Sequence, residues 1–197
     1  MTRSEIASKF FNYRSYTPIP FLVLTFLYLN ANIWSLILGF IVAVSGELIR
    51  LWGVSWAGSE TRTTGGVGGT FLIVSGPFGH VRNPLYVGNI LLYTGMGIMS
   101  FALFPYLQIA GLIFFYIQYW YIVGEEENYL KKTFGEEFDK YLKNVPRFFP
   151  RITRYKSGKV EQPPFSLKAG LRSERRSLQA FSIVTLTIVL IWILRRI

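Results

Sequence analysis

The chain carries, at residues 72–86, the sequence Leu72-Ile-Val-Ser-Gly-Pro-Phe-Gly-His-Val-Arg-Asn-Pro-Leu-Tyr86. Glycine and proline interrupt this polar stretch, which runs directly into a long apolar segment at residues 84–104. Pro84 is favoured in the first turn of a helix, so that segment is predicted to be helical. As the next apolar segment ends, three carboxylates follow one another at Glu125, Glu126 and Glu127. The loop and the acidic triplet end consecutive helices, so we expect them to meet on one membrane face.

The composition indicates a membrane protein. Of the 197 residues, 51% are hydrophobic and only 16% are charged, and the net charge is +10. In such a chain, basic loops mark the cytoplasmic side and contact anionic lipid headgroups, so membrane lipids rather than nucleic acid are the expected partners. The absence of cysteine excludes disulfides and thiolate chemistry, and with one histidine we expect no metal site.

Apolar segments divide the chain. Segments at residues 19–29 and 33–57 predict a helical hairpin, and further segments follow at 84–104, from Pro105 to about Gly124, and at 178–194. The predicted fold is therefore an all-α, polytopic membrane bundle of four to five membrane helices with a cytoplasmic C-terminal helical segment. We expect an N-terminal hairpin (1–57), a core with the ligand pocket (58–151), a basic cytoplasmic segment (152–177) and a C-terminal apolar helix (178–197).

The distribution of basic residues sets the orientation. Of the 21 lysines and arginines, 13 lie at residues 125–178, and Arg50, Arg62 and Arg82 lie in or beside the other polar loop. Both loops are therefore expected to face the cytoplasm, as is the N-terminus. The last apolar segment ends at Arg195 and Arg196, which fits this orientation poorly if the segment crosses the membrane. It could instead lie tilted or at the interface, or pair in an oligomer.

The loop offers ligand-binding groups, although each also has a structural interpretation. Gly76 and Gly79 permit close approach of the backbone, Arg82 supplies a cation, and Tyr86 could stack or donate its hydroxyl. A membrane-entry loop would use the same residues, with Arg82 on phosphate headgroups and Tyr86 in the aromatic belt. His80 could be structural or could transfer a proton near neutral pH.

The acidic triplet is also open to two interpretations. Successive residues on a helix point about 100° apart, so the three carboxylates cannot all face one ligand. One or two could face a pocket, while Glu127 is expected to meet solvent or Lys131. The alternative is a helix end that simply leaves the membrane into solvent. After Gly124 the apolar residues recur at spacings of three and four up to Leu142, which predicts an amphipathic extension of the helix.

These motifs in this order resemble the integral-membrane methyltransferases. The resemblance rests on the Ser75-Gly-Pro-Phe78 and Arg82-Asn-Pro-Leu-Tyr86 motifs, the acidic triplet, Phe134-Gly-Glu-Glu-Phe138 and Val145-Pro-Arg-Phe148. It covers roughly half of the chain, residues 47–151. The superfamily includes isoprenylcysteine carboxyl methyltransferases and phosphatidylethanolamine N-methyltransferases.

The resemblance implies S-adenosylmethionine as cofactor, bound between the last core helices and the cytoplasmic C-terminal segment. Implied cofactor contacts are Phe71, Leu72, Ile73, Phe78, Asn83, Pro84, Leu85 and Tyr86. Glu126 is the acid expected to bind the cofactor ribose, with Glu125 as its neighbour in the paired-acid motif. His80, Arg82 and Arg147 are the candidate catalytic residues: His80 to accept a proton, the arginines to bind a phosphate or carboxylate of the acceptor.

Two departures from the carboxyl methyltransferases bear on the substrate. Those enzymes usually carry histidine at the position of Asn83 and arginine at the position of Ile122, and isoleucine cannot pair with a carboxylate. The tail at residues 134–149 nevertheless resembles the carboxyl-methylating branch. We therefore expect a methyltransferase for a lipidic acceptor with a phospholipid-like amine. The alternatives are an isoprenylcysteine-type carboxyl O-methyltransferase and a non-catalytic membrane scaffold or lipid-binding protein.

Overall fold

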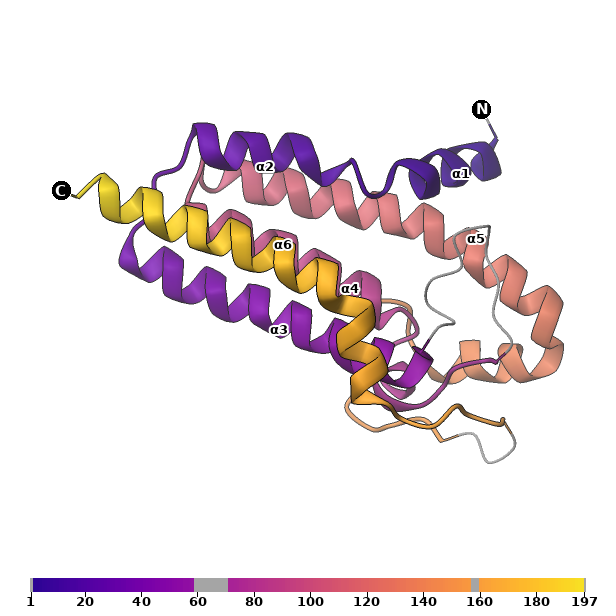
Figure 1. Ribbon diagram of the computed structural model, residues 1–197. Helices are drawn as coiled ribbons and strands as arrows, with labels where there is room; N and C mark the ends of the chain where they lie inside the picture. Colours follow the sequence, from indigo (N-terminus) through magenta and orange to yellow (C-terminus); the bar gives the residue numbers. More distant parts are fainter. Residues whose placement is uncertain (1, 59–70, 157–159, 197) are drawn as a thin grey trace. The chain divides into compact units, whose positions relative to one another are not determined.

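The described part of the chain is entirely helical. The computed structural model describes residues 2–58, 71–156 and 160–196, and within them no strand occurs. Figure 1 follows the elements in order. They are α1 (Arg3–Tyr13), α2 (Pro18–Leu27), α3 (Ile33–Ala57), the short 3₁₀ helix η2 (Gly76–Gly79), α4 (Pro84–Ser100), α5 (Tyr106–Asn144) and α6 (Leu167–Leu194).

Among the described residues, three helices are long and apolar enough to cross a membrane. They are α3, α5 and α6, whose most apolar windows have mean hydropathies of 1.7, 1.4 and 2.2. α2 is apolar but has only 10 residues, and α4 has 17. The helical membrane bundle expected from the sequence is confirmed, and the protein is an integral membrane protein.

The helix boundaries correct the sequence-based expectation at both ends of the chain. α1 was not predicted; it begins with a capping box in which the Thr2 hydroxyl accepts from the Glu5 amide and the Glu5 carboxylate accepts from the Thr2 amide. α6 begins at Leu167, inside the segment expected to be basic and cytoplasmic (152–177), so the helix starts earlier than the expected position 178. The charged residues at 168–176 form the first turns of the same helix that continues into the apolar run.

The amphipathic extension predicted after Gly124 is present and belongs to α5. The helix continues to Asn144, but at Gly135 the backbone leaves helical geometry, with φ 52° and ψ −123°. Only glycine adopts such a conformation without strain. The break lets the last turns of α5, residues 136–144, run in a new direction.

The chain forms two compact units that share its long helices, and each is described by itself. Unit 1 comprises Met1–Glu47, Gly88–Ile122 and Arg176–Ile197. In it, α3 and α4 approach closely through small residues. Gly95 of α4 faces Gly39 and Ala43 of α3, and there is no room for a side chain between them. A Cβ added at Gly95 would lie only 2.7 Å from Ala43 Cα and 2.7 Å from the Gly39 carbonyl oxygen. Such contacts between small residues are typical of packed membrane helices.

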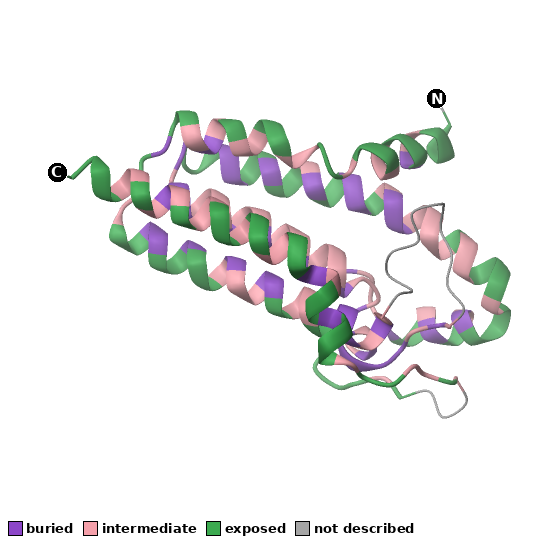
Figure 2. Cartoon of the chain, viewed as in Figure 1, coloured by how far each residue is buried: buried purple, intermediate pink, exposed green. Residues whose placement is uncertain are grey.

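Large apolar side chains remain exposed on unit 1. Trp34 is 71% exposed, Ile41 59%, Ile183 64% and Leu186 67%. In Figure 2 exposed residues recur along α3 and along the apolar part of α6. In a helical membrane protein, such faces are suited to contact with lipid tails.

Unit 2 comprises Leu48–Val87 and Val123–Arg175. Its core combines Leu72 and Val74 from the loop with Phe138, Tyr141 and Val145 from the end of α5 and the turn after it. The alternation of buried Leu72 and Val74 with half-buried Phe71 and Ile73 marks an extended segment with one inward face. Every residue expected to bind the cofactor or to act in catalysis lies in unit 2, whereas Ile122 belongs to unit 1.

Candidate functional site

Residues 78–83 of the loop at 72–86 are hydrogen-bonded to residues 141–155. Three loop carbonyls accept hydrogen bonds: Phe78 from the Tyr141 hydroxyl (2.7 Å), Gly79 from the Tyr155 amide (2.8 Å) and His80 from the Arg151 amide (2.9 Å). In the other direction, the Arg82 amide donates to the Pro146 carbonyl at 2.9 Å. The Asn83 side-chain amide donates to the Arg147 carbonyl at 3.2 Å. These bonds fix the loop against the segment that follows α5.

Two arginines that we predicted to face a substrate share one carboxylate. Arg82 Nε donates to Glu127 Oε1 at 2.9 Å, Arg147 Nε donates to the same oxygen at 3.2 Å, and an Arg147 terminal nitrogen pairs with Glu127 Oε2. Arg82 also donates to the Leu142 and Val145 carbonyls, the former at 3.1 Å. The Glu127 side chain is only 11% exposed. This cluster therefore ties the loop, α5 and the turn after α5 together.

The expected surroundings of Glu127 were wrong. We predicted that Glu127 would meet solvent or Lys131, but its carboxylate is held by Arg82 and Arg147. Lys131 instead pairs with Asp139 at 3.1 Å. The break at Gly135 explains the difference, since it lets the chain after α5 turn back and carry Arg147 to the acidic triplet, which an uninterrupted helix would not do.

Glu126 lies beside the tyrosine with which we expected it to share a ligand. The Tyr86 hydroxyl donates to Glu126 Oε1 at 2.6 Å, and both residues are half-buried. Tyr86 comes from the first turn of α4 and Glu126 from the middle of α5. A carboxylate and a phenol held together in this way can bind hydroxyl and amino groups of a ligand. Glu125, the neighbouring acid, is also half-buried.

His80 is bonded at both its main chain and its ring. Its carbonyl accepts from the Arg151 amide, and its Nδ1 lies 3.0 Å from the Arg151 carbonyl oxygen. Because a carbonyl oxygen only accepts, Nδ1 must carry a hydrogen in the neutral ring, and Nε2 is then the nitrogen that can take a proton. Its ring centroid also lies 6.1 Å from that of Trp52.

Gly76 sits where no larger residue fits. Its φ is +58°, and a Cβ added there would run into the Trp56 indole ring. The glycine therefore allows the loop to turn sharply against α3. Gly79 is similarly confined, since a Cβ would lie 3.0 Å from the Tyr155 carbonyl oxygen.

One residue that the sequence analysis missed holds the extended segment before η2. Gln162 Oε1 accepts from the amides of Val74 (2.8 Å) and Ser75 (3.0 Å), and its Nε2 donates to the Leu72 carbonyl at 2.8 Å. A single carboxamide thus satisfies three main-chain groups of a segment that we expected to contact the cofactor. Nothing in the local sequence around Gln162 predicts this role, because the contact spans 88 positions for Val74.

The other expected cofactor contacts differ in how far they are buried. Pro84 and Leu72 are buried, while Phe71, Ile73, Phe78, Asn83 and Leu85 are half-buried. Leu85 packs near Gly53 of α3, where an added Cβ would lie 2.9 Å from a Leu85 methyl carbon. Ile122, at the position where the carboxyl methyltransferases carry arginine, is 1% exposed.

Comparisons with known proteins agree with the resemblance in the motifs. The family model described as phospholipid methyltransferase matches residues 34–137. The nickel-cobalt-cadmium resistance protein NccN of Alcaligenes xylosoxydans xylosoxydans is 36% identical over 90 residues, which are 45% of this chain and 40% of NccN. The cobalt-zinc-cadmium resistance protein CzcN of Cupriavidus metallidurans is 33% identical over 109 residues, 54% of this chain and 45% of CzcN. The chain thus spans less than half the length of these curated relatives, and no solved structure matches it.

The all-helical membrane bundle, the loop and the acidic triplet agree with this family match. The matched region covers more than half of the chain and includes Asn83, Tyr86, Glu126 and Glu127. The chain belongs to the phospholipid methyltransferase family.

Proposed function

We propose that this protein is an S-adenosylmethionine-dependent membrane methyltransferase that acts on a lipidic acceptor, with a phospholipid-like amine as the favoured class. The observation that carries the proposal is the pairing of Tyr86 with Glu126 at 2.6 Å, beside a loop whose residues 78–83 are hydrogen-bonded to residues 141–155. Preorganised polar groups at a fixed loop are what a small-molecule site requires.

The residues present fit the cofactor. Glu126 supplies a carboxylate that can accept from ribose hydroxyls or an ammonium group, and the Tyr86 hydroxyl stands next to it. Half-buried Phe78 and Leu85 supply apolar surface for a ring. The main-chain groups of Leu72, Val74 and Ser75 are engaged by Gln162, so the proposal assigns binding to the side chains first.

The cofactor, when bound, supplies an electrophilic methyl group on a sulfonium. This chain's residues would position an acceptor nitrogen in line with that methyl and remove the proton that the amine loses. His80 is suited to take the proton on Nε2, because its Nδ1 is fixed by the Arg151 carbonyl. Glu125 is the second candidate for this role.

Arg82 and Arg147 remain the candidates for a phosphate on the acceptor. Both are paired with Glu127, and an arginine fork that holds a carboxylate in this way can also meet a phosphate with its remaining N–H groups. The same arginines keep the carboxyl O-methyltransferase alternative open, because they could pair with an acceptor carboxylate. Ile122, buried and apolar, favours the amine class.

The names of the relatives suggest another role, in metal resistance. In the part of the chain that the structure describes, no three histidine, aspartate or glutamate side chains come together as metal ligands do. If this protein contributes to resistance, we propose that it does so by methylating a membrane component. A non-catalytic scaffold is the competing account.

Calorimetric titration of the detergent-solubilised protein with S-adenosylmethionine tests the proposal. We expect saturable binding at one site, and weaker binding in Tyr86→Phe, which loses the hydroxyl on Glu126. Leu38→Ala, on the exposed face of α3, is the control and should bind as the wild type does. No saturable binding by wild-type protein of intact fold would leave the scaffold account in place.

A further inference from the structure

The first turns of α6 have a fixed inner face. Gly170 packs so closely on Ser55 of α3 that an added Cβ would run into the Ser55 hydroxyl, and the Ser166 amide donates to the Ser55 carbonyl at 2.8 Å. One turn further on, Glu174 is 3% exposed and forms an ion pair with Arg50. These contacts determine which way the helix faces.

The opposite face of these turns carries a stripe of cations. Lys168, Arg172 and Arg175 stand at positions i, i+4 and i+7, a spacing that places them on one side of a helix. All three are exposed, and the beginning of α6 shows this exposure in Figure 2. We call these three residues the α6 stripe.

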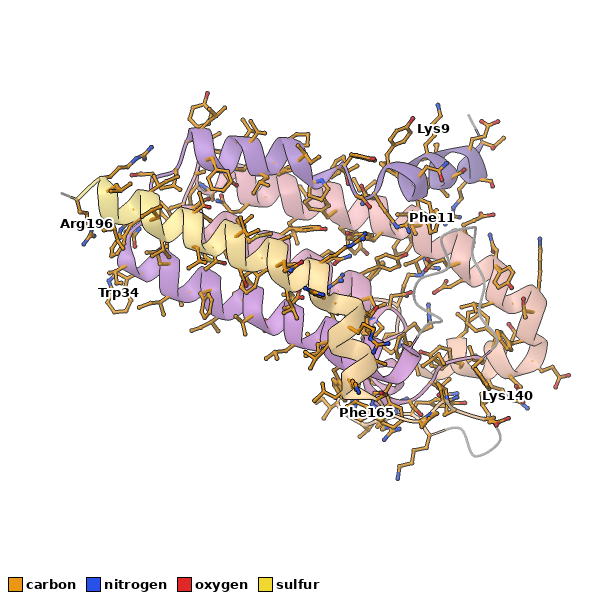
Figure 3. The ribbon with its side chains drawn as sticks, viewed as in Figure 1. Lys9, Phe11, Trp34, Lys140, Phe165 and Arg196 are labelled. Carbon is orange, nitrogen blue, oxygen red and sulfur yellow. The ribbon has the colours of Figure 1, made fainter. Side chains whose placement is uncertain are left out.

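The positive charge of the α6 stripe is not neutralised within the described residues. None of its three members forms an ion pair with a carboxylate there, and the one acid in these turns, Glu174, faces inward on Arg50. Apolar side chains flank the stripe: Leu167 is 49% exposed, Leu171 45%, and Phe165, just before the helix, 49%. Phe165 is labelled beside the start of α6 in Figure 3.

The stripe lies directly before the apolar run of the same helix, which is long enough to cross a membrane. No charged residue follows Arg176 until Arg195, and α6 continues unbroken to Leu194. At 1.5 Å per residue, Arg175 lies within one turn of the apolar run. Cations that project there next to exposed leucine and phenylalanine suit the boundary between headgroups and acyl chains.

We propose that the α6 stripe binds the headgroup phosphates of anionic phospholipids at the membrane surface. A soluble anion such as free phosphate or RNA would not account for the flanking apolar side chains, whereas an anionic lipid matches both the charge and the apolar flank. This surface is separate from the residues assigned to methyl transfer, so it can be tested whether or not the enzyme proposal holds.

The chain has no cysteine, so a single reporter can be placed beside the stripe. Ala169→Cys, at an exposed position, would carry a fluorophore in protein reconstituted into phosphatidylcholine vesicles. The vesicles contain either spin-labelled phosphatidylglycerol or spin-labelled phosphatidylcholine as quencher. We expect stronger quenching by the anionic lipid and a loss of this preference as salt is raised.

Charge variants then test whether the α6 stripe causes the preference for anionic lipid. Lys168→Gln/Arg172→Gln/Arg175→Gln should remove the preference, with the local lipid affinity falling about fivefold for each cation lost. The matched control, Lys132→Gln/Lys140→Gln/Lys143→Gln, removes the same charge from exposed positions on α5 and should keep it. Equal quenching by the two lipids in the wild type, or equal loss in both triple variants, would overturn the proposal. So would single-stranded RNA shifting the fluorescence where the anionic lipid does not.

Discussion

At the residue scale, two adjacent carboxylates of the acidic triplet have different partners. Glu126 accepts from the Tyr86 hydroxyl, while Glu127 holds Arg82 and Arg147. Adjacent positions on a helix point about 100° apart, which is why the two carboxylates reach different partners. We propose that Glu126 binds a ligand, whereas Glu127 joins the loop to the turn after α5.

Glu126→Gln should therefore mainly reduce cofactor binding, whereas Glu127→Gln should mainly reduce the stability of the fold. Glu126→Gln loses a charged acceptor and should weaken S-adenosylmethionine binding about ten- to a hundredfold, with little change in thermal stability. Glu127→Gln leaves two arginines without their shared carboxylate and should destabilise the fold by on the order of 3 kcal/mol.

Calorimetry and thermal denaturation in detergent distinguish the two variants. Lys132→Gln, an exposed substitution five positions after Glu127 on α5, serves as the control for both measurements. If Glu126→Gln and Glu127→Gln lose stability equally and keep the same cofactor affinity, the division of roles is wrong.

Substitutions at Ile122 test which chemical class of acceptor is methylated. Ile122→Arg places a cation at a position that is 1% exposed and close to the apolar part of α5, where an unpaired charge is costly. We expect methylation of amine lipids to fall and carboxyl methylation not to appear. Ile122→Leu, which keeps the apolar character, should retain activity. Efficient methylation of a prenylcysteine analogue by the wild type would return the chain to the carboxyl-methylating class.

At the scale of the elements, the break in α5 assembles the site. Gly135→Ala should lower the free energy of unfolding by on the order of 1–3 kcal/mol, because alanine is strained at φ 52° and ψ −123°. The loss cannot come from a clash, since an added Cβ would meet nothing within 4 Å. Gly111→Ala is the control. Gly111 is helical, and an added Cβ would lie 3.6 Å from the nearest atom, so this variant should be neutral or slightly stabilising.

Thermal denaturation in detergent would measure the stability of both variants. Equal stability would mean that the backbone at Gly135 does not keep its non-helical conformation.

The contact between α3 and α4 depends on small residues. Gly95→Ala forces a methyl group against the backbone of Ala43 and Gly39 and should destabilise the protein by roughly 1–3 kcal/mol or more. Gly97→Ala, two positions away with the nearest atom at 3.5 Å, should be tolerated. Chemical denaturation in mixed micelles compares the two; similar midpoints would show that these helices do not pack through Gly95.

Sequence patterns predicted the elements better than the contacts between them. The apolar runs located α2 and α3 within a few residues, and Pro84 marked the start of α4, because length, hydropathy and proline act locally. Tyr86 and Glu126 were both expected to contact the cofactor, but the hydrogen bond between them was not predicted. The partners of Glu127 and the role of Gln162 were not predicted either, because each depends on how a distant segment returns to the loop. The start of α6 was missed for a related reason: its charged turns are stabilised by packing on Ser55 and by Arg50, not by an apolar pattern.

At the scale of the whole molecule, the basic residues predict that the loop, the acidic triplet and the N-terminus face the cytoplasm. Because the chain lacks cysteine, single cysteines at exposed Lys140 and at exposed Tyr106 would report opposite sides. Membrane-impermeant maleimide applied to intact cells should label the second and leave the first unlabelled until the membrane is opened. Labelling of Lys140→Cys in intact cells would show that the orientation is opposite to the predicted one.

One labelling experiment tests directly whether this membrane protein transfers a methyl group to a lipidic amine, as we propose. Membranes that contain the wild-type protein, or Glu126→Gln as the control, are incubated with methyl-labelled S-adenosylmethionine and then extracted with organic solvent. We predict base-stable label in the lipid fraction with the wild type, and much less with Glu126→Gln. Label released by base as volatile methanol would identify a carboxyl acceptor, and no protein-dependent label in any fraction would contradict the account.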